Sequence, residues 1–116
     1  MWRYRCLCAS CFIETSLFAS TAKRVIEESE LIAMQEELLR NLFAGDLAAG
    51  TGGARKIRVA TSGSGKRGGA RVMYRYSQRI AKVYLLLAYA KNETGTLSPA
   101  GRRHIRMMVE TLDREI

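Results

Sequence analysis

Apolar residues in the first third of the chain recur at helical spacing in two consecutive segments. The first segment, which Ser16 can open as an N-cap, has its inward positions at Phe18, Ala22, Val25 and Ile26. The second begins near Ser29 and has its inward positions at Leu31, Met34, Leu38 and Leu42. Gly45 follows and is available as a left-handed C-cap. We predict a helical hairpin here, preceded by a short strand at residues 12–15.

The middle of the chain changes to the alternating pattern of strands. Residues 54–61 alternate two apolar side chains with Lys56 and Arg58, which predicts a half-buried strand with a basic outer face. Residues 70–76 alternate in the same way, and residues 83–90 are apolar enough to form a central strand. Because glycine-rich and polar turns separate these segments, the pattern predicts an antiparallel meander.

A last amphipathic segment predicts a C-terminal helix. Ser98 can cap it, Pro99 suits its first position, and its apolar stripe consists of Ile105, Met108, Val109, Leu112 and Ile116. Helices and strands grouped in this order indicate an α+β domain, with the helical hairpin and the C-terminal helix packed on one face of a small, mainly antiparallel sheet. The opposite face would be left to the basic residues. With 116 residues the chain has room for a single domain, over residues 11–116.

Charge is distributed unevenly along the chain. The 19 Lys and Arg residues exceed the 11 Asp and Glu residues by a net +8, a balance that favours a polyanionic partner such as nucleic acid. Residues 93–116 hold four residues of each sign and are balanced. A solvated surface usually mixes both signs, so a block of cations alone is expected to bind an anion. Residues 47–92 form such a block, with no carboxylate and ten cations: Arg55, Lys56, Arg58, Lys66, Arg67, Arg71, Arg75, Arg79, Lys82 and Lys91.

The first ten residues are expected to be a loosely ordered extension that the domain does not need. They contain Cys6 and Cys8, which together with Cys11 and the single histidine, His104, do not suggest a closed four-ligand metal site. No apolar run reaches the roughly 20 residues that a membrane-spanning helix requires, and the short run before Glu14 does not resemble a secretion signal. We therefore expect a cytoplasmic protein without a membrane partner.

The glycine-rich segment at residues 62–69 contains the string GSGKRG, which has the spacing of a dinucleotide fingerprint. A strand is expected after it instead of a helix, and Ala60 and Arg67 stand where a P-loop needs glycine and a hydroxyl residue. Neither nucleotide motif is therefore present. The segment is either a plain hairpin loop or a loop whose amides, together with Lys66 and Arg67, hold phosphates. The surrounding charge favours the second interpretation.

Few residues of this chain could act as a general acid or base. His104 lies on the expected C-terminal helix, and the central block has no carboxylate. Lys, Arg and Tyr side chains on neighbouring strands suit transphosphorylation at an RNA phosphodiester, in which cations stabilise the charge that develops on phosphate oxygens. The residues alone thus indicate an RNA-binding α+β domain that could be a nuclease.

Three strings in the central block carry a family resemblance: GTGGARKIR, GKRGGARV and YLLLAYAKNE. Over residues 12–112 the chain resembles the RelE/HigB-type toxins of bacterial type II toxin–antitoxin systems, although Leu42 and Ala49 stand where such toxins often have proline. The resemblance implies a RelE-like fold and an mRNA interferase, which is an endoribonuclease that cleaves mRNA in the ribosomal A site without a metal or other cofactor. It also implies a cognate antitoxin as partner.

The resemblance implies a site as well. By motif, four residues match the cationic active-site positions of the family: Lys56, Arg58, Arg71 and Lys91. A second set is expected to bind RNA or the ribosome: Arg55, Lys66, Arg67, Tyr89 and Asn92. Tyr89 is either a platform on which a base stacks or a buried edge tyrosine, and Asn92 stands where some relatives have another cation.

Two other functions remain compatible with the residues. One is a non-catalytic module that binds DNA or RNA. The other is a gyrase-inhibiting toxin of the ParE type, which shares the scaffold of the superfamily and lacks the cationic active site. The dense set of cations on the expected strands argues against the ParE type.

Overall fold

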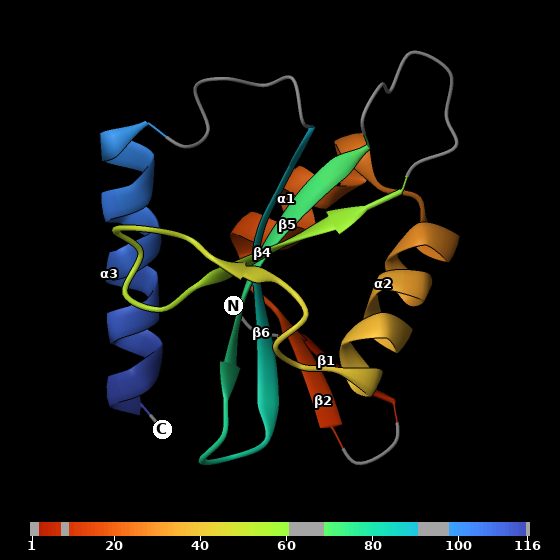
Figure 1. Cartoon of the computed structure of the whole chain (residues 1–116), viewed down its shortest axis with the longest axis horizontal. Coiled ribbons are helices and arrows are strands. Elements are labelled where there is room, and N and C mark those ends of the chain that lie inside the picture. The colour runs from red at the N-terminus through yellow and green to blue at the C-terminus, as the bar shows by residue number, and fades with distance from the viewer. Residues whose placement is uncertain (1–2, 8–9, 61–68, 91–97, 116) are drawn as a thin grey trace.

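The computed structural model describes residues 3–7, 10–60, 69–90 and 98–115. Within these residues the elements are, in chain order, β1 (Arg3–Leu7), β2 (Ser10–Glu14), α1 (Ser16–Val25), α2 (Glu28–Arg40), β3 (Asp46–Leu47), β4 (Arg55–Val59), β5 (Ala70–Ser77), β6 (Lys82–Ala90) and α3 (Pro99–Glu115). The described strands form one sheet in the order β1-β2-β6-β5-β4-β3, with α2 and α3 on opposite sides of the molecule (Figure 1). The expected α+β class is confirmed.

Strands β4, β5 and β6 form the expected antiparallel meander. Arg58 pairs with Arg71, and Arg71 pairs with Tyr89, so residues far apart in the chain lie in one line across the three strands. The sheet as a whole is mixed, because β2 lies parallel to β6 along its other edge, with Ile13 opposite Tyr84. This parallel pair joins the first strands of the chain to the last one.

Both faces of the sheet are covered, so the expectation that all helices pack on one face is wrong. Helices α1 and α2 bury their apolar sides on one face, in a cluster that includes Leu85 of β6. Helix α3 packs on the other face, where Ile105 lies in one cluster with Tyr84 and Leu86. The reason lies in β6, whose residues 83–89 are all buried. A strand that is apolar on both sides needs cover on both sides.

The N-cap of α1 is Thr15, one residue before the expected Ser16. The Thr15 hydroxyl oxygen accepts a hydrogen bond from Phe18 N–H at 3.1 Å, and the hydroxyl donates one to the Leu85 carbonyl at 3.0 Å. Thr15 therefore fixes the start of α1 to β6. The expected cap of α3 by Ser98 is confirmed, since Ser98 Oγ accepts a 3.1 Å hydrogen bond from a first-turn backbone N–H.

Gly45 has a packing role and is not the expected left-handed cap of α2. The helix ends at Arg40, and Gly45 does not have a positive φ. A Cβ on Gly45 would lie 2.7 Å from the Lys56 carbonyl oxygen, so only glycine lets the chain pass this close to β4. Gly45 N–H donates to the Tyr74 hydroxyl at 2.9 Å, and that hydroxyl donates to the Leu42 carbonyl at 3.1 Å. Tyr74 thereby fixes the α2–β3 connection to the sheet.

The first residues also differ from the expected loose extension. Arg3–Leu7 forms β1, which pairs antiparallel with β2 and places Arg5 opposite Phe12. The local reason is that β2 would otherwise be the edge of the sheet, with unpaired backbone groups that a preceding strand can satisfy. That residues 1–10 are dispensable for the domain stays a prediction.

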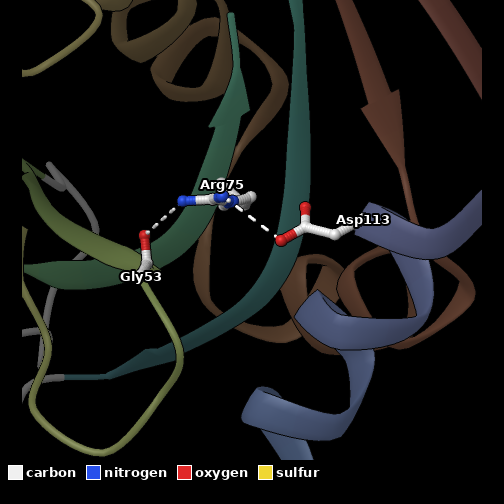
Figure 2. A network of polar contacts seen from close by, with 3 residues as sticks. All are labelled: Gly53, Arg75 and Asp113. Carbon is white, nitrogen blue, oxygen red and sulfur yellow. Dashed lines mark hydrogen bonds and ion pairs between the residues drawn. The ribbon is translucent and has the colours of Figure 1, made fainter. Parts of the chain in front are cut away.

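Arg75 of β5 links α3 to the sheet and to the β3–β4 connection (Figure 2). Its Nη2 forms an ion pair with Asp113 Oδ2 at 3.3 Å, and its Nη1 donates to the Gly53 carbonyl at 3.4 Å. The two paired side chains are 30% and 44% exposed. Solvent screens such a pair, so its contribution to stability is at most about 1 kcal/mol. Burial of the apolar stripe of α3 therefore contributes more than this ion pair to holding the helix on the sheet.

We expect Tyr74→Phe to lower the free energy of unfolding by about 1–3 kcal/mol, because it removes a buried hydroxyl that satisfies two backbone groups. Urea unfolding followed by circular dichroism measures the loss. Tyr76→Phe is the matched control, since Tyr76 is half-buried on the same strand and contacts Phe43 through its ring. The control should change stability by about 0.5 kcal/mol or less. Equal losses in both variants would contradict the role given to the Tyr74 hydroxyl.

Candidate functional site

Three of the expected active-site cations lie on one face of the sheet. The apolar residues of β4 are buried against α1 and α2, so Lys56 and Arg58, which alternate with them, point toward the opposite face. Arg71 is the register partner of Arg58 and shares that face. Opposed residues of an antiparallel pair have Cβ atoms about 4.5–5.5 Å apart, so the side chains of the two arginines leave the sheet next to each other. We call Lys56, Arg58 and Arg71 the cationic row.

The cationic row shares its face with α3, and does not lie on a helix-free face as expected. The cluster under α3 includes Met73 of β5 and Leu87 of β6, which are register partners of each other beside the row. Helix α3 therefore covers part of the face and leaves the row accessible. Arg58 is exposed, whereas Lys56 and Arg71 are half-buried.

The electrostatics of the row favour an anion. Directly opposed like charges destabilise a pair of strands, and Arg58 and Arg71 oppose each other across β4 and β5. Asp46 of β3 lies opposite Lys56, two residues along β4 from Arg58, so the carboxylate in register with the row is at its Lys56 end. One guanidinium nitrogen of Arg71, Nη1, donates to the Ala70 carbonyl at 3.4 Å, which fixes the direction of its side chain. A phosphate group can accept from several such donors at once, and arginine presents its donors in a planar fork that matches phosphate oxygens.

Tyr89 extends the line of the row onto β6, where it is the register partner of Arg71. Its side chain is 5% exposed and belongs to the cluster under α3, which favours the interpretation as a buried edge tyrosine over a base-stacking platform. Burial raises the pKa of the Tyr89 hydroxyl above its ordinary value of 10.0, and the nearby Arg71 opposes part of this rise. At neutral pH Tyr89 is therefore a neutral phenol, suited to donate a hydrogen bond and not to act as a base.

Arg55 does not join the row. It alternates with Lys56 along β4 and so faces the side of α1 and α2. Its guanidinium carbon lies 5.0 Å from the centre of the Phe43 ring, and its Nη1 donates to the Gly45 carbonyl at 2.8 Å. These contacts give Arg55 a structural role at the α2–β3 connection. The sequence offered a signal for this, because the alternation of β4 already separates Arg55 from Lys56 and Arg58.

Four expected site residues lie outside the described residues: Lys66, Arg67, Lys91 and Asn92. The described ends of their segments are in register, since Val59 pairs with Ala70 and Ala70 pairs with Ala90. Both segments therefore attach to the sheet one residue beyond the Arg58–Arg71–Tyr89 line. The roles of these four residues stay predictions.

The arginines of α3 are placed unevenly along the helix, which the net charge of its segment does not show. Residues 93–116 are balanced as a whole, but three of the four arginines of the helix lie in its first half, where Arg102, Arg103 and Arg106 line a hollow of about 270 Å³ beside Gly50. The position of each arginine along the helix shows this cluster, whereas the net charge of the segment does not. His104 is exposed on the same helix, next to a second, mainly apolar hollow.

A small α+β protein whose mixed sheet carries a row of three cations on one accessible face belongs to the class of candidate nucleic-acid-binding proteins. None of the helices in the described part of the chain is both long and apolar enough to cross a membrane. The family described as the RelE toxin of the RelE/RelB toxin–antitoxin system matches residues 12–115. The chain therefore belongs to the RelE toxin family, the toxins of toxin–antitoxin modules, and the resemblance seen in the sequence is confirmed.

The raised pKa of Tyr89 predicts a pH dependence of stability. Because the pKa is raised in the folded state, the neutral phenol stabilises the fold below pH 10.0, and this contribution is lost as the pH rises toward the folded-state pKa. Tyr89→Phe should therefore lose less stability than the wild type between about pH 9 and about pH 10.5 in urea unfolding. Burial also raises the pKa of Tyr74, so part of the decline in stability remains in both proteins. An identical decline in the two proteins would contradict the prediction.

Proposed function

We propose that this toxin is a metal-independent endoribonuclease that cleaves mRNA in the A site of the ribosome and so inhibits translation. The observation that carries the proposal is the cationic row, in which Lys56, Arg58 and Arg71 share one accessible face of the sheet, with Asp46 of β3 opposite Lys56. Membership of the RelE toxin family supports it. The proposal places the protein in the cytoplasm, where ribosomes translate.

The proposed reaction is transphosphorylation. The 2′-oxygen of a ribose attacks the adjacent phosphorus and the bond from phosphorus to the 5′-oxygen breaks, leaving a 2′,3′-cyclic phosphate and a free 5′-hydroxyl. The proton lost by the 2′-hydroxyl is balanced by one gained by the departing 5′-oxygen. Negative charge builds up on the phosphate oxygens in between, and preorganised cations stabilise that charge in the transition state.

The residues of the row suit different parts of this reaction. Arg58 and Arg71 are opposed across β4 and β5, so they can hold two oxygens of one phosphate. Lys56 lies two residues from Arg58 on the same face and adds a third cation. Lysine is one of the side chains that act as a general acid or base, which makes Lys56 and Lys91 the candidates for proton transfer.

We further propose a cognate antitoxin as the partner that neutralises the toxin, as the toxin–antitoxin family implies. A non-catalytic nucleic-acid-binding module is the alternative that the same row of cations would serve. The two are separated by adding the purified protein to translating ribosomes and mapping new mRNA 5′ ends. Cleavage within codons in the A site supports the endoribonuclease, and binding without new ends supports the module.

Arg71→Ala should abolish growth arrest when the toxin is produced without its antitoxin. Removing one preorganised charge-stabilising group typically costs about 10²–10³ in rate, and a toxin slowed this much no longer outpaces mRNA synthesis. Lys56→Ala should behave in the same way. Growth of induced cultures and mRNA cleavage in a translation extract measure the effect.

His104→Ala is the control for these two variants, because His104 is exposed on α3 and should stay toxic. Circular dichroism should show all three variants folded, since substitutions at such accessible positions usually shift stability by about 0.5 kcal/mol or less. The proposal fails if His104→Ala removes toxicity while both cation variants still arrest growth.

Lys66→Gln and Arg67→Gln should each weaken RNA binding and reduce its dependence on salt. A phosphate contact to single-stranded RNA releases condensed counterions, so losing one contact lowers the slope of log K against log salt by about 0.7. Fluorescence anisotropy with a labelled RNA over a salt series measures the slope. An unchanged slope in both variants would assign these residues to a plain hairpin loop.

A further inference from the structure

The charges in the first half of α3 are arranged against the helix dipole. Its first turn has no acidic residue, and the helix carries three arginines in its first half: Arg102, Arg103 and Arg106. The carboxylates follow later, with Asp113 paired to Arg75 of the sheet. A helix N-terminus carries partial positive charge, so nearby cations are unfavourable there and anions are favourable. Arg102 and Arg106 are also like charges four residues apart, which repel each other on one helix face.

The three arginines do not compensate this cost with contacts inside the protein. All are exposed, and within the described part of the chain none of their side chains has a hydrogen bond or ion pair. They line, with Gly50 and Pro99, the hollow of about 270 Å³ that lies between the start of α3 and the β3–β4 connection. We call this hollow the arginine cleft.

Glycines of the β3–β4 connection bring that connection close to the arginine stems. Gly50 and Gly52 have φ values of +76° and +74°, which favour glycine, and a Cβ on Gly52 would lie 3.2 Å from Arg106 Cγ. The stems of Arg102 and Arg106 therefore rest beside backbone, which leaves their guanidinium groups to point outward. The cleft thus presents several arginine donors and no acceptor side chain.

The start of α3, which lines the arginine cleft, lies toward the same upper edge of the molecule as the end of β6 (Figure 1). Tyr89, near the end of β6, continues the line of the cationic row. The helix packs on the face that the row occupies, since Tyr89 and Ile105 belong to one cluster. A strand of RNA held by the row could therefore continue along this face toward α3.

We propose that the arginine cleft binds the phosphodiester backbone of the single-stranded RNA substrate, next to the phosphate that the cationic row holds. The inference rests on the proposed function and adds a second contact with the same substrate. A phosphate chain is favoured over an acidic peptide, because the lining consists of arginine, glycine and proline and offers no apolar pocket in which a peptide side chain could anchor. Guanidinium forks and a helix N-terminus are both suited to phosphate.

The test compares two variants that lose the same charge. One is R102Q/R103Q/R106Q, and the matched control is K23Q/R24Q/R40Q, whose residues are exposed on α1 and α2. Fluorescence anisotropy with a labelled single-stranded RNA of about 12 nucleotides gives the affinity and its salt slope. We expect the cleft variant to bind about tenfold more weakly at low salt and to lower the slope by about 2, whereas the control stays closer to the wild type.

Folding is checked in the same variants. The cleft variant should melt at the same temperature as the wild type or higher, because it removes cations from a helix N-terminus. R102K/R103K/R106K keeps the charge and should keep most of the salt slope. If the glutamine variant melts lower, the lysine variant decides: a retained slope supports the proposal, and a lost slope gives the arginines a structural role and overturns it.

Two further outcomes would overturn the proposal. Equal losses in the cleft variant and the control would show that RNA senses only net charge. Unchanged RNA binding, combined with weaker binding of a labelled polyglutamate peptide, would assign the cleft to an acidic protein partner. The proposed cleavage activity can fail independently, because toxicity of Arg71→Ala depends on the row and the salt slope of the cleft variant depends on α3.

Discussion

Strand β6 is apolar along both of its sides, and the arrangement of the other elements depends on covering it. Its residues 83–89 are all buried, with Leu85 facing α1 and α2 and Leu86 facing α3. Parallel pairing with β2 and antiparallel pairing with β5 satisfy its backbone on both edges. Because α3 must lie over one side of β6, it occupies the same face as the cationic row. The polar site of this protein is thus set beside a core, and not on a separate surface.

The position beside the core explains how the row can be both charged and fixed. Neighbouring strands hold Arg58 and Arg71 in register, and the buried Tyr89 closes the line on the side of β6. The backbone positions of these cations therefore cannot move apart without breaking strand pairs, which supports the proposal that the row binds an anion. Repulsion between these like charges lowers the stability of the sheet. Burial of the two apolar clusters offsets this loss.

Periodicity was sufficient to predict the three helices of the described residues and the meander, because each of these depends on residues close in the chain. It also placed Lys56 and Arg58 on one side of β4. The remaining features depend on contacts between distant residues: the parallel pairing of Ile13 with Tyr84, the face chosen by α3, and the closeness of Gly45 to β4. Arg55 was placed in the site by its charge, although its alternation in β4 already pointed to the other face.

The parallel pairing of β2 with β6 has a consequence for the order of folding. Thr15 and Leu85, which it brings together, are 70 residues apart in the chain, so the ends of a long loop must meet before α1 is fixed to the sheet. Contacts of such separation form slowly and late, whereas the β4–β5 pair closes a much shorter loop. Strand β6 follows the other strands of the described sheet along the chain. The toxin therefore completes this sheet only after residues 82–90 have been made, and a chain that ends before them lacks the strand on which both layers of helices rest.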